Sequence, residues 1–391
     1  MTVPVAKRRV STGAALVAAL LVLVVAGCAS RPTGDVLVPV SLPADVDRSV
    51  QVLAATTRAR AQDDPLAFTA QRADQVNFQS YTFSIPPTHV SGKIEWPSRT
   101  PGNPATDVVV TASKPLSESG FKDALRAEIA SRPDRHGAVF VFIHGFNTSH
   151  PEAVFGAARL AADLRATAGA AVVFSWPSLA RVTAYVADRE SANYSRDSLE
   201  RTLNAIASVP DVQSINLVAH SMGTWLTAET LRQASIGGRA PFLKKLDHVV
   251  LLSPDIDKDV FKTQLAVIKK TRSPMIVVVS RDDRALATSQ ILAGGVSRVG
   301  NVLVDDPRAQ AAISHYGVEV VDLSNLSSSD ALGHSKFADV LPELENITAA
   351  SGGGNRRPLG GSAIFVLGGA GQILSAPARV GDALAEAAAP D

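Results

Sequence analysis

The peptide LVAHSMG, residues 217–223, places a serine in the setting of a nucleophile elbow. An unassisted serine hydroxyl is a poor nucleophile, so it needs a base to take its proton, an acid to orient that base, and N–H donors for the oxyanion. Ser221 follows a β-prone run and precedes a helical pattern that begins near Met222, which is the strand–turn–helix context of an elbow. Gly223 is small, as the tight turn requires, and we interpret Ala219 as a tolerated small residue in place of the usual glycine. The alternative is an ordinary turn whose serine caps the helix.

A second apolar run, FVFIHGFN, ends upstream of the elbow and offers donors for an oxyanion hole. Gly145 lets the backbone turn, so we predict that the N–H of Phe146 faces the nucleophile, with Asn147 as the alternative. The N–H of Met222 is the second predicted donor, at the positive end of its helix. His144 comes before the serine in the chain, and we therefore interpret it as a buried histidine that shapes the loop.

The acid and the base should follow the serine, because on an α/β sheet the three groups sit at strand ends in the order Ser, Asp or Glu, His. Asp283, in PMIVVVSRDDRAL, is the predicted acid, and Asp255, in VVLLSPDID, is the alternative; either could instead cap a helix. His334, in DALGHSKF, is the predicted base because it follows the last expected strand. His315 precedes that strand and so belongs to the opposite edge of the sheet. A solvent-exposed loop histidine is the alternative for His334.

The elements that must position these residues follow from composition and periodicity. The chain has 391 residues, 46% of them hydrophobic, and a net charge of +1, which allows one large α/β domain and gives no reason to expect nucleic acid as a partner. After Ser117, unbroken Val/Ile/Leu runs alternate with amphipathic helical patterns, so we predict a mostly parallel sheet with helices on both faces. Before Ser117, short β-prone runs predict antiparallel strands. Ligands bind beyond the carboxyl ends of such strands.

The pattern predicts particular segments as elements. The expected N-terminal strands are residues 50–58, 76–86, 92–97 and 107–113. The expected helices are residues 117–132, 151–169, 189–209, 222–234, 259–270 and 337–347.

The N-terminus has the features of a secretory signal. Three basic residues at 7–9 precede thirteen apolar residues at 14–26, a run too short for a membrane span of about 20 residues. The tetrapeptide VAGC resembles a bacterial lipobox, so we predict a signal peptide over 1–27 and acylation of Cys28, the one cysteine of the chain. An uncleaved anchor or a chance cysteine is the alternative. Ala29 follows the cysteine, which by resemblance to Gram-negative lipoproteins favours the outer membrane or its periplasmic face.

Polar and glycine-rich segments flank the predicted domain. Residues 28–49 are expected to be a tether from the lipid to the domain. Residues 351–391 form a Gly/Ala-rich tail, for which we expect disorder or docking on the membrane or the domain.

Taken together, the segments VFIHGFN, FSWPS, LVAHSMG, SPDID, SRDDRALATSQILAGG and LGHSKF resemble a bacterial family of α/β hydrolases of unknown function within the esterase/lipase superfamily. The resemblance covers roughly residues 50–347, and we predict one α/β-hydrolase domain over residues 50–350. It implies an α/β-hydrolase fold and a Ser-Asp-His mechanism, which match Ser221, Asp283 and His334 here. It does not decide between Asp283 and Asp255, and it implies no substrate.

The resemblance also points to residues that could contact a substrate. Trp176 and Ser178 lie in the strand-end segment FSWPS, and Tyr185 lies just beyond it. Core packing is an equal alternative for Trp176.

The predicted function is that of a lipid-anchored carboxylic-ester hydrolase of the cell envelope that acts on a small-molecule ester or a lipid. No cofactor or metal is expected, because the histidines are scattered and the one cysteine is predicted to carry lipid. A non-catalytic envelope-binding module, and the same triad acting on thioesters or amides, are the alternatives.

Overall fold

The computed structural model describes residues 31–42, 48–164, 169–238, 240–269 and 271–326, and the backbone of residues 364–366. The signal peptide, Cys28, His334 and the expected helix at 337–347 lie outside the described residues. None of the helices in the described part is both long and apolar enough to span a membrane.

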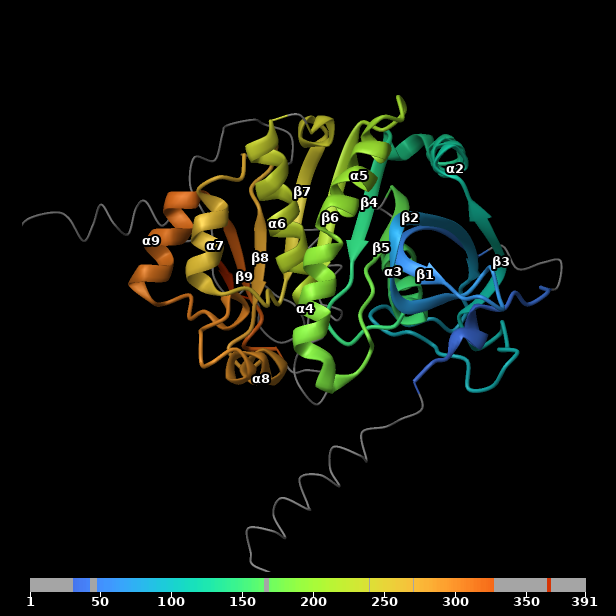
Figure 1. Cartoon of the computed structure of the whole chain (residues 1–391), viewed down its shortest axis with the longest axis horizontal. Coiled ribbons are helices and arrows are strands. Elements are labelled where there is room, and N and C mark those ends of the chain that lie inside the picture. Colours follow the sequence, from blue (N-terminus) through green and yellow to red (C-terminus); the bar gives the residue numbers. More distant parts are fainter. Residues whose placement is uncertain are drawn as a thin grey trace, which may run out of the picture.

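The described strands form a ten-stranded sheet with the order β10-β9-β8-β7-β6-β4-β5-β1-β2-β3 (Figure 1). Antiparallel pairing joins β1 to β2 and β2 to β3, and the remaining neighbours are parallel. The predicted mostly parallel sheet with antiparallel strands on its N-terminal side is thereby confirmed. The strands are β1 (Ser49–Arg60), β2 (Phe68–Ser84), β3 (Val109–Leu116), β4 (Ala138–Ile143), β5 (Ala170–Ser175), β6 (Ser214–His220), β7 (Leu246–Leu252), β8 (Ile276–Val279), β9 (Glu319–Asp322) and β10 (Ile364–Val366).

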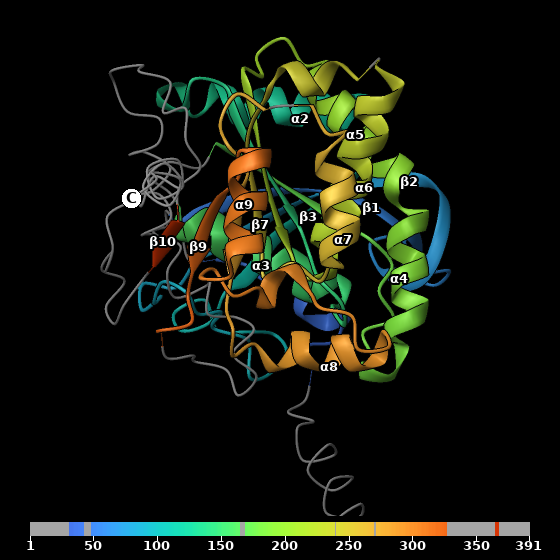
Figure 2. The same cartoon turned by 90° about the vertical axis from the view of Figure 1, so that its left-hand side faces the viewer.

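Helices cover both faces of the sheet. One apolar cluster packs the sheet against α2, α4, α5, α6, α7 and α9, and the other packs it against α3. Figures 1 and 2 show α4, α6 and α7 together on one side of the strands. The helices are α2 (Glu118–Ala130), α3 (His150–Asp163), α4 (Tyr185–Tyr194), α5 (Arg196–Ala207), α6 (Met222–Gly237), α7 (Lys258–Leu265), α8 (Arg284–Leu292) and α9 (Pro307–Tyr316), and the short 3-10 turns are η1 (Gly34–Leu37), η2 (Pro133–Arg135), η3 (Val182–Ala184), η4 (Pro241–Lys244) and η5 (Val299–Asn301).

The expected strand at residues 92–97 is wrong, because this segment pairs with no neighbouring strand. Ile94 and Trp96 both pack against the cluster around α3, and the Trp96 ring stacks on Phe155 with centroids 4.6 Å apart. Alternate side chains therefore point inward without a ladder of hydrogen bonds. The Glu95 carboxylate holds the segment instead, accepting from the Val90 amide at 3.0 Å.

The expected single helix at 189–209 is two helices, α4 and α5, which meet at Ser195. The buried Ser195 hydroxyl donates to Ser191 O at 2.8 Å and lies 2.8 Å from Thr57 Oγ1 on β1. A serine that bonds to backbone competes with helical hydrogen bonds, and here a contact with the sheet fixes it at the break. Helices α8 and α9 were not among the expected helices.

Candidate active site

Ser221 lies in the turn between β6 and α6 with φ 52° and ψ −123°. A non-glycine residue with this backbone is strained and persists only where its surroundings enforce it. Its N–H donates to Leu252 O at 2.9 Å, and its carbonyl accepts from Thr224 N at 2.9 Å and Thr224 Oγ1 at 2.6 Å. The Ser221 side chain makes no capping hydrogen bond to α6. The hydroxyl is thus held at a strand end by backbone contacts, and helix capping does not explain it.

The small residues of the elbow differ in how tightly they are packed. A Cβ on Gly223 would lie 2.6 Å from Ile143 O and closer still to His144 O, so this position accepts glycine alone. Ala219 is fully buried in β6, where its methyl packs within the core. The departure from glycine at Ala219 is therefore accommodated as a core contact.

The loop after β4 passes directly over the elbow. A Cβ on Gly145 would come within 2.8 Å of the Ser221 Cβ and 3.0 Å of His220 Nδ1. Phe146 follows immediately, which brings its amide into the neighbourhood of the nucleophile. Asn147 has φ 57°, and its amide donates to Asp188 Oδ2 at 3.3 Å. Because the Asn147 amide is committed to Asp188, the geometry favours Phe146 over Asn147 as an oxyanion donor.

Met222 is the first residue of α6. The first amides of a helix have no carbonyl within the helix to which they can donate, and the helix dipole makes that end positive. The Met222 amide therefore lies among the N-terminal amides of α6, and its role as an oxyanion donor stays a prediction.

His144 is 1% exposed, and its ring stacks on Trp176 with centroids 4.8 Å apart. Its Nδ1 and Nε2 lie 2.9 Å and 3.0 Å from the carbonyls of Gly145 and Trp176, and Trp176 Nε1 donates to His144 O at 2.7 Å. Burial and, to a lesser extent, the Arg58 charge lower the His144 pKa to about 3. The ring is therefore neutral and donates one of its two contacts. The stacking and hydrogen bonds between His144 and Trp176 join the loop after β4 to the loop after β5.

The predicted substrate contacts are mostly inside the protein. Trp176 and Ser178 are both fully buried, and Ser178 Oγ donates to Asp188 Oδ2 at 2.5 Å. Asp188 also accepts from the Leu179 amide at 2.7 Å, which shapes the loop after β5. Tyr185 is 6% exposed and meets the Phe146 ring edge-on at 5.4 Å. Trp176 occupies a core position, which was the alternative interpretation of this residue. Tyr185 packs against the side chain of Phe146, the predicted oxyanion donor. Contact of Trp176, Ser178 and Tyr185 with a substrate stays a prediction.

Asp255 belongs to a buried network beside the elbow, and its amide lies 3.4 Å from Ser221 O. Tyr185 donates to its Oδ2 and Ser289 to its Oδ1, each at 2.8 Å. Arg298 Nε lies 3.2 Å from the same Oδ1, and both partners of this ion pair are 2% exposed. Burial raises the Tyr185 pKa to about 12, so the phenol is a neutral donor. Both carboxylate oxygens of Asp255 therefore have structural partners already.

Asp283 follows β8 at the same edge of the sheet and is 1% exposed. Its Oδ1 accepts from Leu286 N at 3.0 Å and so caps α8, the alternative role named for it. The cap shows that the Asp283 carboxylate has a structural role at the start of α8. His315, in the last turn of α9, precedes β9 and so lies toward the opposite edge. The partner expected for Asp283, His334, is outside the described residues.

Two buried arginines support the site and were not singled out from the sequence. Arg298 holds Asp255, as described above. Arg58, 2% exposed, donates to Ser175 Oγ at 3.1 Å, Ser178 O at 3.0 Å and Thr148 O at 2.9 Å. Burial lowers the Arg58 pKa to about 9. A lone arginine in a β-prone run carries no sequence signal of burial, so pattern reading could not find either residue.

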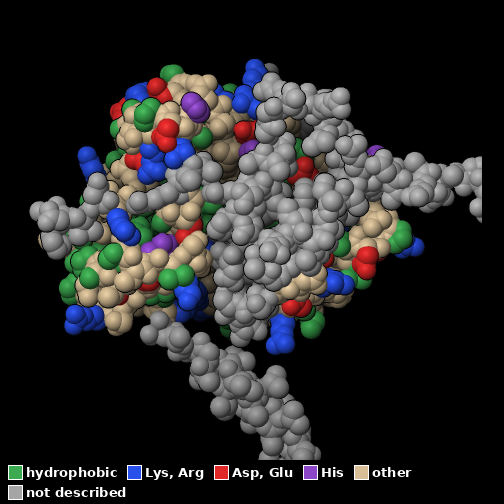
Figure 3. All heavy atoms as spheres, turned by 180° about the vertical axis from the view of Figure 1, so that it is seen from behind, with side chains coloured by type: hydrophobic (Ala, Val, Ile, Leu, Met, Phe, Trp, Pro, Cys, Tyr) green, Lys and Arg blue, Asp and Glu red, His purple; other side chains and the backbone are tan. Residues whose placement is uncertain are grey.

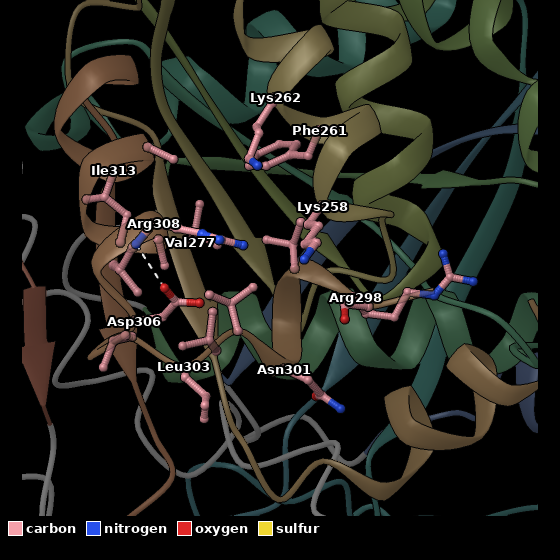
Figure 4. A pocket seen from close by; sticks show the side chains of 18 of the residues that line it. Lys258, Phe261, Lys262, Val277, Arg298, Asn301, Leu303, Asp306, Arg308 and Ile313 are labelled. Atoms are coloured by element: carbon pink, nitrogen blue, oxygen red, sulfur yellow. Dashed lines mark hydrogen bonds between the residues drawn. The ribbon is translucent and has the colours of Figure 1, made fainter. Parts of the chain in front are cut away.

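A cavity of about 600 Å³ lies between α7, α9 and η5, away from the nucleophile (Figure 4). Its wall is apolar around Phe261, Val277 and Ile313, and neither Ser221 nor Asp283 lines it. Arg298 borders it but extends away from the other side chains drawn. The cavity therefore does not reach the nucleophile, although it adjoins the candidate site through Arg298 and through Asn301, which donates to Asp283 O at 3.3 Å. No group of three or more His, Cys, Asp or Glu residues in the described part is placed to hold a metal ion.

Comparison with known protein families gives a match. A family model described as "Alpha/beta hydrolase of unknown function (DUF900)" matches residues 117–350, more than half of the 391 residues. No curated protein matches the chain.

Proposed function

The chain belongs to the family of alpha/beta hydrolases of unknown function (DUF900), and from this premise we propose that it is a lipid-anchored serine hydrolase of carboxylic esters. The observation that carries the proposal is the strained Ser221, which does not cap its helix and lies against the Gly145 loop. A strained backbone of this kind is typical of a functional position.

In the proposed mechanism, Ser221 attacks the ester carbonyl while His334 accepts its proton. Asp283 holds the imidazole in the correct orientation, and the amides of Phe146 and Met222 stabilise the oxyanion of the tetrahedral intermediate. His334 then protonates the leaving alcohol. A water molecule, deprotonated by the same histidine, releases the acid and restores the serine.

Asp283 is the proposed acid because it follows β8 at the same edge of the sheet as Ser221 and comes after the serine in the chain, as the order Ser, Asp, His requires. Tyr185, Ser289 and Arg298 hold the Asp255 carboxylate in place. Swinging it toward a histidine would break these contacts and leave a buried arginine without its counter-ion.

The proposed location is the cell envelope, at the outer membrane or its periplasmic face. The support is the basic, apolar and VAGC sequence of residues 7–28, whose acylated cysteine would hold the protein on a membrane. A small-molecule ester or a lipid is the proposed substrate.

A fluorophosphonate probe tests the nucleophile. We expect the protein to be labelled and the Ser221→Ala variant to be unlabelled. Ser253→Ala is the matched control, because Ser253 is also buried at a strand end with positive φ and is expected to leave labelling intact. Labelling of Ser221→Ala would identify another nucleophile, and absence of labelling in the folded protein would favour an envelope-binding module. Matched ester, thioester and amide substrates then separate the bond types.

A further inference from the structure

The predicted tether is fixed to the domain at the rim of the candidate site. Arg31 Nε and Nη2 donate to the two carboxylate oxygens of Glu152, at 3.0 Å and 2.7 Å. Its Nη1 donates to Asn147 Oδ1 at 2.7 Å and to Ala180 O at 2.6 Å, and its Nη2 also donates to Asn147 O. A two-pronged arginine–carboxylate pair fixes orientation as well as position. One side chain thus joins the tether to the loops that follow β4 and β5.

Covalent geometry then limits where a lipid on Cys28 can be. Two residues separate Cys28 from Arg31 in the sequence. Successive Cα atoms are about 3.8 Å apart, so three steps reach at most about 11 Å. The Cα of an acylated Cys28 would therefore lie within about that distance of the Arg31 Cα, and the Arg31 side chain contacts Asn147 in the loop that carries Phe146.

The same edge of the sheet exposes large apolar side chains. Val182, in η3, and Val186, at the start of α4, are 61% and 70% exposed, and Ile291 and Leu292, at the end of α8, are 76% and 57% exposed. We call these four residues the apolar rim. Figures 1 and 2 both show α8, the start of α4 and the beginning of the described chain at the lower end of the molecule. Buried hydrogen bonds to Asp255 from Tyr185 on α4 and Ser289 on α8 join the two halves of the rim.

Basic side chains accompany the apolar rim. Arg181 precedes Val182, and Arg281 and Arg284 flank the start of α8; all three are exposed. Of the two acidic residues between Arg281 and Arg284, Asp283 is buried, and the exposed Asp282 accepts from the Ser280 hydroxyl at 2.6 Å. Viewed from behind, the lower edge of the described surface also shows blue basic beside green hydrophobic side chains (Figure 3). Apolar side chains with arginines around them suit the interface of a bilayer that contains anionic lipids.

We propose that this edge of the sheet docks on an anionic phospholipid bilayer, with the apolar rim inserted and the tether held there by Arg31. The inference rests on the proposed lipid anchor. It makes the bilayer itself the partner of the site, because Ser221 lies at the edge that faces it. The substrate class that follows is an ester presented from the membrane, such as an acyl lipid.

Fluorescence quenching in vesicles tests the docking surface. The full chain, acylated and reconstituted in phosphatidylcholine–phosphatidylglycerol vesicles, carries a fluorophore on Val186→Cys or Ile291→Cys. Acylation would occupy the Cys28 thiol, so the introduced cysteine is the one that is labelled. Ile236→Cys is the matched control, because Ile236 is 60% exposed at the far end of α6. We expect lipids brominated in their acyl chains to quench the labels at 186 and 291 severalfold more than the label at 236.

Equal quenching at the three positions would overturn the proposal, and so would unquenched labels at 186 and 291 on bound protein. A chain that does not bind the vesicles contradicts it as well. The quenching experiment does not depend on catalysis, so its outcome is independent of the outcome of the fluorophosphonate test. Quenching at the apolar rim in a protein that the probe does not label would keep the docking surface and reject the hydrolase.

Discussion

Loops at the carboxyl ends of the parallel strands and loops at their amino ends differ in how much strained backbone they contain. Five non-glycine residues in the described chain have positive φ, and four of them follow β4, β5, β6 or β7: Asn147, Ala180, Ser221 and Ser253. The fifth, His136, lies at the amino end of β4, where Gly137 shares the turn. Strained backbone gathers where surrounding contacts enforce it, and functional sites are such places. The strained backbone of this molecule is therefore concentrated at the carboxyl-end edge, where parallel sheets bind ligands.

The largest expected effect is a loss of activity that distinguishes Asp283 from Asp255, the two candidate acids at the carboxyl-end edge of the sheet. Asp283→Asn should lower ester hydrolysis by about 10⁴-fold, because the proposed base loses the group that orients it. Asp255→Asn should act mainly on stability, since it leaves Arg298 buried without its charge partner, and losses of this kind are about 3–5 kcal/mol. Steady-state kinetics and chemical unfolding of both variants measure the two effects. If Asp255→Asn instead loses activity at full stability while Asp283→Asn stays active, the assignment of the acid is reversed.

A second prediction compares the two ends of α6. Gly223 is tightly packed in the elbow, whereas Gly237 at the other end has open space around it. In Gly223→Ala, the added methyl would meet the carbonyls of Ile143 and His144, which are backbone and cannot move aside. We expect a loss of a few kcal/mol in the free energy of unfolding, about the cost of overpacking a core. Gly237→Ala, in the same helix with nothing within 4 Å, is the control and should stabilise slightly. Similar unfolding curves for the two variants would contradict this account of the turn.

The loss of stability at acid pH should depend on His144, which pairs with Trp176 to join the loops after β4 and β5. The His144 pKa is lowered by burial to about 3, so between about pH 6.5 and pH 3 the unfolded chain binds a proton that the folded chain does not. Stability is therefore complete above this window and falls as the pH falls through it, by at most about 1.4 kcal/mol per pH unit for this group. Chemical unfolding of the protein and of His144→Gln at several pH values measures the slope, which should be shallower in the variant. His315→Gln, which changes an exposed ring, is the control, and an unchanged slope in His144→Gln would contradict the expectation.

The smallest effect concerns the tether. Arg31 is 40% exposed on its side chain, so its ion pair with Glu152 is expected to contribute no more than about 1 kcal/mol. Arg31→Ala should leave hydrolysis of soluble esters within about 2-fold and reduce hydrolysis of vesicle-bound esters severalfold, because the edge no longer has a fixed orientation. Arg48→Ala is the control, because Arg48 is an exposed arginine in the same N-terminal region whose side chain donates to Pro87 O at 3.5 Å. An equal loss on both substrates would show that Arg31 acts on the chemistry and not on docking.

Much of this edge could be predicted from the sequence, because strand ends follow from apolar periodicity. The buried runs of β4 and β6 placed His144 and Ser221 at strand ends correctly, and the order of parallel strands then brought their loops together. Capping signals for α9 were also present: Asp306 and Pro307 begin it and Gly317 ends it.

The remaining features depend on contacts between distant segments. The break at Ser195 needs Thr57 on β1, and the buried position of Arg298 needs Asp255. In the sequence, Arg31 is one polar residue of the predicted tether. Its contacts with Asn147 and Ala180 become visible only in the folded structure. Periodicity reports local structure, and it carries no information on which distant groups a polar side chain will meet.

The proposed nucleophile is Ser221, the strained serine at the end of β6, and mass spectrometry of a labelled protein tests this assignment. The intact protein is treated with a fluorophosphonate, digested, and the modified peptide is identified by mass spectrometry. The account predicts a single adduct on the Ser221 hydroxyl that does not form after denaturation. An adduct on another residue, or no adduct on the folded protein, would contradict it.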